Sequence, residues 1–304
     1  MKDEKEEEGP LHNLHPSSFI PHPLNMHYGL IAGNGRFPFM VVEGARRAGV
    51  SLSIAAIREE ADPRLEQEVE HFTWVGIGQL GKLLRFFKAE GVEKAIMAGQ
   101  VKHVRIFSGA IPDARMLKML LKLPRRNTNS LIGGIAGELA REGIDLVDST
   151  CFLQDFLPAA GAITRRKPNP AERADIAYGK EITEQLTALN LGQTIVVRGK
   201  ACVAIEAMEG TDATIRRAGE VMRGEHQHGA EIAVPSSGPL TVLKLSKADQ
   251  DMRFDVPVVG VSTIRVMADA GATCLCISAG KTLLFDRDEM ISLADQNKIA
   301  IIAV

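Results

Sequence analysis

Short apolar runs alternate with amphipathic segments along the first half of the chain, after a charged and proline-rich beginning. The apolar runs have the length of buried strands and lie at residues 28–32, 51–57, 94–98 and 144–147. Apolar residues at helical spacing follow Pro38, which suits a first helical turn, and recur over 81–90, 113–123 and 132–142. The acidic stretch 59–70 is typical of a solvated connection or a surface helix. This alternation predicts an α/β fold with a doubly wound, mostly parallel, Rossmann-like sheet.

The second half has a different pattern. Asn169 is a good N-cap and Pro170 a good first residue for a helix that continues to about residue 189. Two strands turned at Gly199-Lys200 predict a hairpin over 194–206. Further strands are expected at 241–245, 273–278 and 299–304, and further helices at 262–270 and from residue 286. The predicted organisation is a flexible extension over 1–25, a nucleotide-binding domain over 26–160, a linker over 161–170 and a C-terminal α/β catalytic domain over 171–304.

Composition narrows the classes of function. The chain has 304 residues, a formal net charge of -2 and 5% aromatic residues, which argues against nucleic acid as a partner. Five of its first eight residues are acidic, whereas a signal peptide begins with basic residues followed by apolar ones. No apolar stretch approaches the roughly 20 residues that span a bilayer. We therefore expect a cytoplasmic protein.

Two glycine turns follow predicted strands. The first is Gly33-Asn34-Gly35, and a glycine turn between a strand and a helix presents backbone N–H groups that suit phosphate. Pro38 occupies the place of the third glycine in the dinucleotide fingerprint, which argues against a nicotinamide-dependent oxidoreductase. The second turn contains Gln100 and Lys102, which have the chemistry to contact a nucleotide. A tight turn without a ligand, or simple solvent exposure, is the alternative for each.

Acidic residues gather in two places in the second half. Glu206, Glu209 and Asp212 fall within seven residues, where they suit magnesium or substrate unless Arg216 and Arg217 neutralise them. The segment 247–257 carries an acidic and basic ladder that would lie on one side of an extended chain. Such a ladder suits phosphate hydrolysis, in which a carboxylate binds a metal or activates water and a cation stabilises the charge of the phosphate. The alternative is that these residues form the exposed, charged edge of a sheet.

Taken together, these segments resemble one family, the UDP-2,3-diacylglucosamine pyrophosphatases of the non-calcineurin class, which act in lipid A synthesis. The motifs that carry the resemblance lie at 29–38, 99–102, 148–150, 161–164, 192–194, 206–212 and 250–257. The resemblance implies two domains with the site in the cleft between them. It implies magnesium-dependent hydrolysis of UDP-2,3-diacylglucosamine to UMP and 2,3-diacylglucosamine 1-phosphate, with water attacking the sugar-side phosphorus. It also implies a homodimer formed by the C-terminal domains.

The resemblance also assigns roles to residues. The expected catalytic residues are Asp251, Asp212, Arg253 and Gln250. The expected substrate-binding residues are Gly33, Asn34, Gly35, Gln100, Lys102, Gln193, Glu206, Thr211 and Lys247. The expected ligands of Mg²⁺ are Asp251, Asp255 and Glu209. A non-catalytic sensor that binds a sugar nucleotide is the alternative, since it would keep the site but not need its acids.

A diacylated substrate needs an apolar surface for its acyl chains. Residues 106–126 combine leucine, methionine and isoleucine with several lysines and arginines. This pattern fits an apolar wall with a basic rim that contacts the cytoplasmic face of the inner membrane. An ordinary amphipathic core helix is the alternative.

Overall fold

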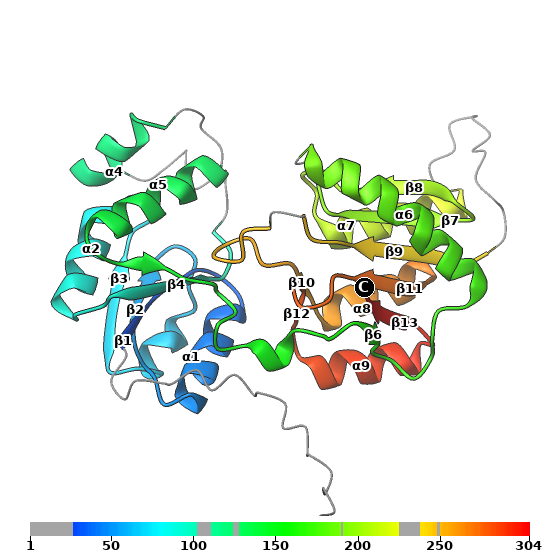
Figure 1. The fold of residues 1–304 in the computed structure, drawn as a ribbon, viewed down its shortest axis with the longest axis horizontal. Helices are drawn as coiled ribbons and strands as arrows, with labels where there is room; N and C mark the ends of the chain where they lie inside the picture. Colours follow the sequence, from blue (N-terminus) through cyan, green and yellow to red (C-terminus); the bar gives the residue numbers. More distant parts are fainter. Residues whose placement is uncertain (1–26, 102–110, 124–127, 190, 225–237, 248–249) are drawn as a thin grey trace, which may run out of the picture.

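The computed structural model shows two α/β domains, each built on its own sheet (Figure 1). It describes residues 27–101, 111–123, 128–189, 191–224, 238–247 and 250–304. The N-terminal domain contains β1 to β5, and the C-terminal domain contains β6 to β13. The predicted α/β architecture is confirmed.

The N-terminal sheet is parallel throughout, with strand order β3-β2-β1-β4-β5. Its strands are β1 (His27–Ala32), β2 (Ser51–Ile57), β3 (His71–Val75), β4 (Lys94–Ala98) and β5 (Asp145–Leu146). The strand β3 was not expected from the sequence, because its polar and aromatic residues form no apolar run. The acidic stretch before it forms the 3-10 helix η1 (Pro63–Gln67). Strand order changes direction between β1 and β4, the place where doubly wound sheets bind ligands.

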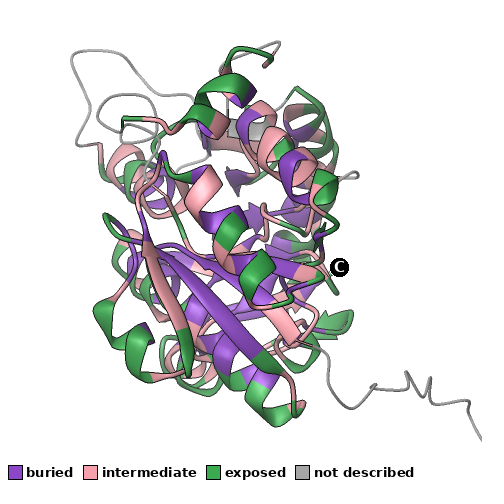
Figure 2. Cartoon of the chain, turned by 90° about the vertical axis from the view of Figure 1, so that its left-hand side faces the viewer, coloured by how far each residue is buried: buried purple, intermediate pink, exposed green. Residues whose placement is uncertain are grey.

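Helices cover both faces of this sheet, and the strands in the interior are buried (Figure 2). The helix α1 (Phe37–Arg47) packs on the face that carries Leu30 and Ile54. The other face carries Ile31 and Ala55, and it is covered by α2 (Leu80–Ala89), α4 (Ala114–Leu120) and α5 (Thr128–Arg141). Adjacent residues of one strand therefore belong to different cores, which is why these strands are apolar without alternation.

The C-terminal sheet is mixed, with strand order β6-β13-β11-β9-β7-β8. Its strands are β6 (Gly161–Ala162), β7 (Thr194–Arg198), β8 (Ala201–Ile205), β9 (Leu240–Lys244), β11 (Ala272–Ile277) and β13 (Ala300–Ala303). The predicted hairpin is confirmed as β7 and β8. Gly161 and Ala162, in the segment predicted as linker, pair with β13. A second, two-stranded sheet joins β10 (Val258–Val259) to β12 (Leu283–Leu284).

Helices again cover both faces of the larger sheet. On one face lies α6 (Pro170–Ala188), whose predicted start is confirmed by a capping box between Asn169 and Glu172. On the other face lie α7 (Thr211–Arg223), α8 (Val261–Ala270) and α9 (Arg287–Gln296). From the sequence, only an acidic cluster was expected at the start of α7, because three acidic residues and two glycines interrupt the helical pattern. None of the helices in the described part of the chain is long and apolar enough to cross a membrane.

Contacts between the domains connect the acidic segment and β12 to the N-terminal sheet. Leu283 is fully buried within the apolar core that includes Leu30 and Phe37. The ring centroids of Phe285 and Phe37 lie 6.0 Å apart, and Arg36 forms an ion pair of 2.9 Å with Asp286. The segment between β9 and β10 extends toward the end of β4 in the centre of the molecule (Figure 1). The C-terminal domain thus contacts the carboxyl edge of the N-terminal sheet.

Candidate functional site

The two predicted glycine turns meet at the point where strand order changes direction. Asn34 and Gln100 exchange backbone hydrogen bonds of 2.7 and 2.9 Å, and the Gly33 N–H donates to Ala98 at 2.8 Å. A Cβ atom on Gly33 would lie 2.6 Å from the Gln100 carbonyl oxygen, and one on Gly99 would lie 2.7 Å from that of Asn34. The two turns therefore need glycine for close backbone contact. Lys102, which was expected beside Gln100, lies outside the described residues.

The acidic segment is a turn, so the prediction of an extended ladder is wrong. The N–H groups of Phe254 and Asp255 both donate to the Asp251 carbonyl oxygen, at 3.3 and 3.0 Å. The amide of Gln250 donates to the Asp255 carbonyl, which closes the turn from the other side. Main-chain hydrogen bonding within the segment decides this shape, and the charged side chains do not line one face. The described part of the segment also forms no sheet edge before β10.

Asp251 and Arg253 form the closest charged pair of this turn. The guanidinium donates to both carboxylate oxygens, at 2.8 and 2.6 Å. These hydrogen bonds lower the pKa of Asp251 and raise that of Arg253. Asp251 is therefore a carboxylate at neutral pH, and a general acid role would be unfavourable for it. Lys247 lies 3.8 Å from Asp255, which keeps a second cation at the turn.

The other predicted acidic residues lie at the carboxyl edge of the C-terminal sheet. Glu206 follows β8 and accepts a hydrogen bond of 3.1 Å from the Thr211 hydroxyl in the first turn of α7. Asp212, in the same turn, accepts hydrogen bonds from Ser262 at 2.8 Å and Thr263 at 3.2 Å. These two hydroxyls belong to the first turn of α8. Asp212 thus links the N-termini of two adjacent helices.

Glu209 has a different environment from the one predicted. It forms an ion pair of 2.6 Å with Arg217, in line with the internal network that was the alternative for this cluster. Backbone N–H groups of Glu209 and Ala207 lower the pKa of this carboxyl first, and Arg217 lowers it further. Among the described residues, no three His, Cys, Asp or Glu side chains gather as they would around a metal ion. Asp251, Asp255 and Glu209 are thus not gathered as three ligands of one ion in this structure, and Glu209 is paired with Arg217 instead.

Magnesium does not require three protein ligands. It is usually held by one or two carboxylates, with substrate phosphates and water completing the shell. Asp251 and Asp255 lie in one turn, and the Asp255 side chain is 44% exposed. Their oxygen chemistry fits Mg²⁺ bound together with a phosphate.

Ser149 joins the two halves of the candidate site. Its N–H donates to the Met252 carbonyl at 2.9 Å. Its hydroxyl lies 2.6 Å from the Met97 carbonyl near the end of β4 and 2.7 Å from the Arg253 carbonyl. A single residue thus holds the acidic turn beside the strand that leads to Gly99 and Gln100. We define the candidate site as these glycine turns, Ser149, the acidic turn at residues 250–255, the end of β9 and the starts of α7 and α8.

Two residues of this site were not predicted from the sequence. Ser149 lies in a short motif that was noted without a role, and Lys244 ends an apolar strand as an isolated charge. Lys244 is only 8% exposed. A lysine that interrupts an otherwise apolar buried strand was the available signal, since buried lysines need a compensating partner. Gln193, which was predicted, precedes β7 and donates its N–H to Glu206 at 3.3 Å.

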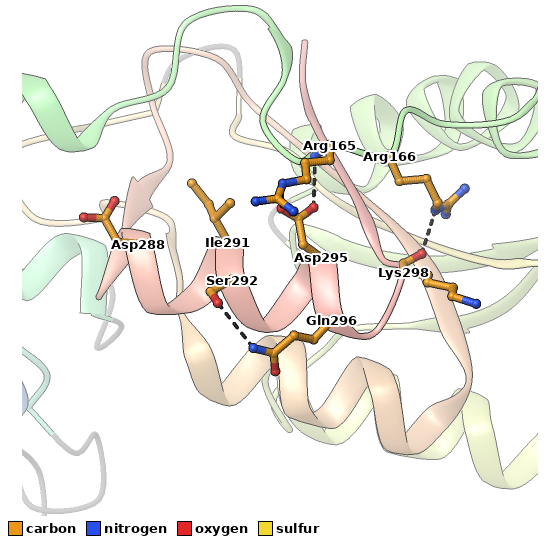
Figure 3. Close-up of a pocket in the computed structure, with 8 residues that line it drawn as sticks. All are labelled: Arg165, Arg166, Asp288, Ile291, Ser292, Asp295, Gln296 and Lys298. Atoms are coloured by element: carbon orange, nitrogen blue, oxygen red, sulfur yellow. Dashed lines mark hydrogen bonds and ion pairs between the residues drawn. The ribbon is translucent and has the colours of Figure 1, made fainter.

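A surface pocket lies away from the candidate site. It has a volume of about 560 Å³ and is lined by Arg165, Arg166, Lys298 and the outer face of α9 (Figure 3). The backbone N–H of Arg165 donates to the Asp295 carboxylate, and the guanidinium of Arg166 donates to the Lys298 carbonyl. Lys298 precedes β13, so this pocket lies at the amino edge of the C-terminal sheet, opposite the candidate site. Its cations are largely used in holding α9 and β13 in place.

Comparisons with known proteins match both domains. Residues 27–156 match the model of the LpxI N-terminal domain, and residues 159–302 match that of the LpxI C-terminal domain. The chain is 30% identical over 282 residues to the UDP-2,3-diacylglucosamine pyrophosphatase LpxI of Caulobacter vibrioides. That alignment covers 91% of this chain and 96% of the relative.

Two solved structures are similar over part of the chain, at a TM-score of 0.24 each. One is phosphoribosylglycinamide synthetase from Anaerococcus prevotii, at 10% identity over 57% of this chain and 31% of that one. The other is the biotin carboxylase domain of a thermophilic 2-oxoglutarate carboxylase, at 9% identity over 56% and 34%. This chain therefore spans about a third of each, and a likeness of this size says nothing further about fold or function.

Proposed function

Because the chain belongs to the LpxI family and is a hydrolase of the UDP-2,3-diacylglucosamine pyrophosphatase type, we propose that it cleaves this substrate with the help of Mg²⁺. The products would be UMP and 2,3-diacylglucosamine 1-phosphate. The observation that carries the proposal is the meeting of the two sheet edges. Ser149 holds the acidic turn against the strand that ends in Gly99 and Gln100, so nucleotide-binding backbone and phosphate-binding charges share one place. No described feature favours the sensor alternative.

We assign the roles in binding and hydrolysis according to the chemistry of each residue. We assign the nucleotide to the turns at Gly33–Gly35 and Gln100, whose backbone allows close approach. Arg253 would neutralise charge on the phosphates. Asp251 and Asp255 would hold Mg²⁺, which when bound polarises phosphate oxygens and lowers the pKa of water. Hydrogen bonds from the Ser262 and Thr263 hydroxyls fix the position of the Asp212 carboxylate, which would orient the attacking water.

The reaction consumes one water molecule. We assign the attack to the phosphorus on the sugar side. The water oxygen becomes bonded to that phosphorus, and the bond between the same phosphorus and the bridging oxygen breaks. UMP leaves with the bridging oxygen, and one proton is released.

Incubation of the purified chain with UDP-2,3-diacylglucosamine tests the proposal. We expect UMP release with Mg²⁺ and little release with EDTA, measured by liquid chromatography. Absence of UMP in the presence of Mg²⁺ would contradict the proposed activity. Release that EDTA leaves unchanged would contradict the role of the metal alone. In ¹⁸O-water the label is expected in the sugar phosphate, and label in UMP would reverse the assignment of the attacked phosphorus.

We also propose contact between the N-terminal domain and the inner membrane. On the described part of the segment, Ile111 is 93% exposed, Leu121 75% and Leu117 48%. Lys118 and Lys122 are exposed beside them, while Met116 and Met119 on the opposite face of α4 are buried. An apolar ridge with lysines at its side suits an anionic lipid surface and the acyl chains of the substrate.

A homodimer formed by the C-terminal domains remains our proposal for the assembly. The support for it is the edge strand β8, next to which Leu189, Leu191, Ile205 and Met208 are exposed. Sedimentation equilibrium of the wild type and of Ile205→Lys measures this directly. We expect the wild type to be dimeric and the variant to dissociate more readily. A monomeric wild type would contradict the proposal.

A further inference from the structure

Lys244 is a buried cation that the roles above leave without a function. It ends β9 and is 8% exposed, and its Nζ donates to the Val258 carbonyl at 2.8 Å. No other hydrogen bond and no ion pair within 4.0 Å joins the side chain of Lys244 to the described residues. An ammonium group has three N–H donors, so two of them have no partner in this part of the chain. Leaving buried charged donors unused is costly.

The position of Lys244 places it inside the candidate site. Lys244 pairs across the sheet with Thr194 of β7. The Thr194 hydroxyl lies 3.1 Å from the Thr211 hydroxyl at the start of α7. The carbonyl that the Lys244 side chain contacts belongs to Val258, two residues before Gly260, the N-cap of α8. Neither α7 nor α8 has a side-chain cap at its N-terminus. Two helix ends with partial positive charge therefore accompany the ammonium at one sheet edge.

Other polar atoms around Lys244 also lack partners. In the described part of the chain, buried oxygens with no hydrogen bond include Gln193 Oε1, Ser246 Oγ and Thr282 Oγ1. Gln193 accepts the N–H of Leu245, the residue after Lys244, at 3.0 Å. Ser246 donates its N–H to the Ser278 hydroxyl, and Thr282 donates its N–H to the Ser278 carbonyl. Unsatisfied buried oxygens are rare in proteins, so three of them on segments that hydrogen-bond to Leu245 and Ser246 indicate that a polar ligand or water completes this place.

The pKa of Lys244 lies below its ordinary value, because burial disfavours the ammonium form. The negative charges of Glu206, Asp212 and Asp255 raise this pKa and offset part of the effect of burial. Each of these carboxylates has other partners, namely the Thr211 hydroxyl, the hydroxyls of α8 and Lys247 respectively. They favour the ammonium form without occupying its N–H donors. The donors remain available for an anionic oxygen.

We propose that Lys244 is a catalytic residue that donates hydrogen bonds to a non-bridging oxygen of the pyrophosphate, with the Ser246 hydroxyl beside it. This inference rests on the proposed function and adds a phosphate-contacting group under the acidic turn. A cation placed in a buried site stabilises charge that develops on phosphate more strongly than an exposed one. Lys247 and Arg253, which are more exposed, would serve the outer side of the same group.

The test compares Lys244→Met, Lys244→Arg and Ser246→Ala with the wild type. Methionine keeps the buried length without the charge, and arginine keeps a charge. We expect Lys244→Met to lower kcat/KM by about 10²–10³-fold, the usual loss for one charge-stabilising donor, and Lys244→Arg to recover part of it. Lys200→Met is the matched control. Lys200 is exposed in the hairpin turn at the other edge of the same sheet, and its replacement should leave kcat/KM unchanged.

A binding measurement separates a phosphate contact from a structural role. In an Asp251→Ala background, calorimetry with UDP-2,3-diacylglucosamine should show weaker binding by at least tenfold when Lys244→Met is added, at an unchanged melting temperature. Unchanged binding and a kcat/KM within threefold of the wild type would overturn the inference. If Lys244→Met fails to fold, Lys244→Arg and Ser246→Ala decide, and wild-type kinetics in both would overturn it. Failure of the proposed function itself looks different, because the wild type then releases no UMP.

Discussion

The two domains present the same edge of a sheet to the candidate site but use different parts of the chain there. At the N-terminal sheet the contacts are made by backbone groups of Gly33, Asn34 and Gln100. At the C-terminal sheet the groups are side chains, with Glu206, Asp212 and Lys244 at strand and helix ends.

This difference indicates a division between shape and charge. A backbone site depends on close approach and is sensitive to added volume, whereas a side-chain site depends on ionisation and is sensitive to lost charge. The same contrast recurs away from the site. The C-terminal domain buries Glu172 completely with Arg166, while the N-terminal pair Arg46 and Glu68 lies near the surface.

The largest effect is expected from Asp251→Ala. Loss of this carboxylate should lower kcat by about 10³-fold, within the range for groups that bind metal or act on water. Asp62→Ala is the matched control in the other domain, because Asp62 and Arg64 form the same local pair at 2.6 Å. Steady-state UMP release measures both. Equal losses in the two variants would contradict the assignment of charge chemistry to the acidic turn.

The next effect concerns stability. Glu172→Gln should lower the free energy of unfolding by about 3 kcal/mol, because Arg166 loses a mostly buried partner that it contacts at 2.6 and 2.9 Å. Glu68→Gln, which changes the exposed pair with Arg46, should cost about 1 kcal/mol or less. Urea unfolding at pH 7 provides both values. Similar costs would remove the contrast between the domains.

The same pair predicts a pH dependence. Burial raises the pKa of Glu172, but hydrogen bonds from Arg166, Thr273 and Asn169 outweigh it and leave the pKa below its ordinary value of 4.5. The folded state therefore binds this proton more weakly than the unfolded state. The contribution is complete above pH 4.5 and is lost as the pH falls through the lowered pKa. Urea unfolding between pH 6 and 3.5 should show a smaller decline for Glu172→Gln than for the wild type.

A smaller effect is expected at the backbone site. Gly99→Ala places a Cβ atom 2.7 Å from the Asn34 carbonyl oxygen at a φ of +94°, so we expect it to destabilise the chain by about 1–3 kcal/mol and to raise KM. Gly91→Ala is the control, since Gly91 has a φ of +67° with nothing within 4 Å of the added atom. It should cost about 1 kcal/mol and leave KM unchanged. A KM that also stays unchanged in Gly99→Ala would contradict a nucleotide role for this turn.

The smallest effect is expected at the surface of α4. Changing both Leu117 and Leu121 to Asp should reduce binding to anionic phospholipid vesicles and raise KM for the diacylated substrate several-fold, because about 0.8 kcal/mol is lost for each CH₂ no longer buried. Stability should hardly change, since both side chains are exposed. The exposed Val304, replaced by Asp, provides the control in the other domain, because it belongs to neither proposed contact surface. Unchanged vesicle binding would contradict membrane contact.

The local pattern of the chain predicted most elements that have an apolar run or a helix cap of their own. The capping box at Asn169 and the hairpin at Gly199-Lys200 are examples, since neighbouring residues alone determine them. The strand β3 and the helix α7 escaped prediction for the opposite reason. His71–Val75 forms a strand because β2 provides a partner, and Thr211–Arg223 forms a helix because one face packs on the C-terminal core.

By itself, the sequence determined the α/β class, the two glycine turns and the family, because these depend on short motifs and their order. Only the tertiary structure decided which charges work together. Asp251 turned toward Arg253 because main-chain hydrogen bonds bend the acidic segment, and Glu209 was neutralised by Arg217, eight residues along the chain on α7. Lys244 became part of the site because β9 lies between β7 and β11 and the segment before α8 folds over its side chain. Burial and partner geometry, which set the cost of a charge, arise from contacts between segments far apart in the chain.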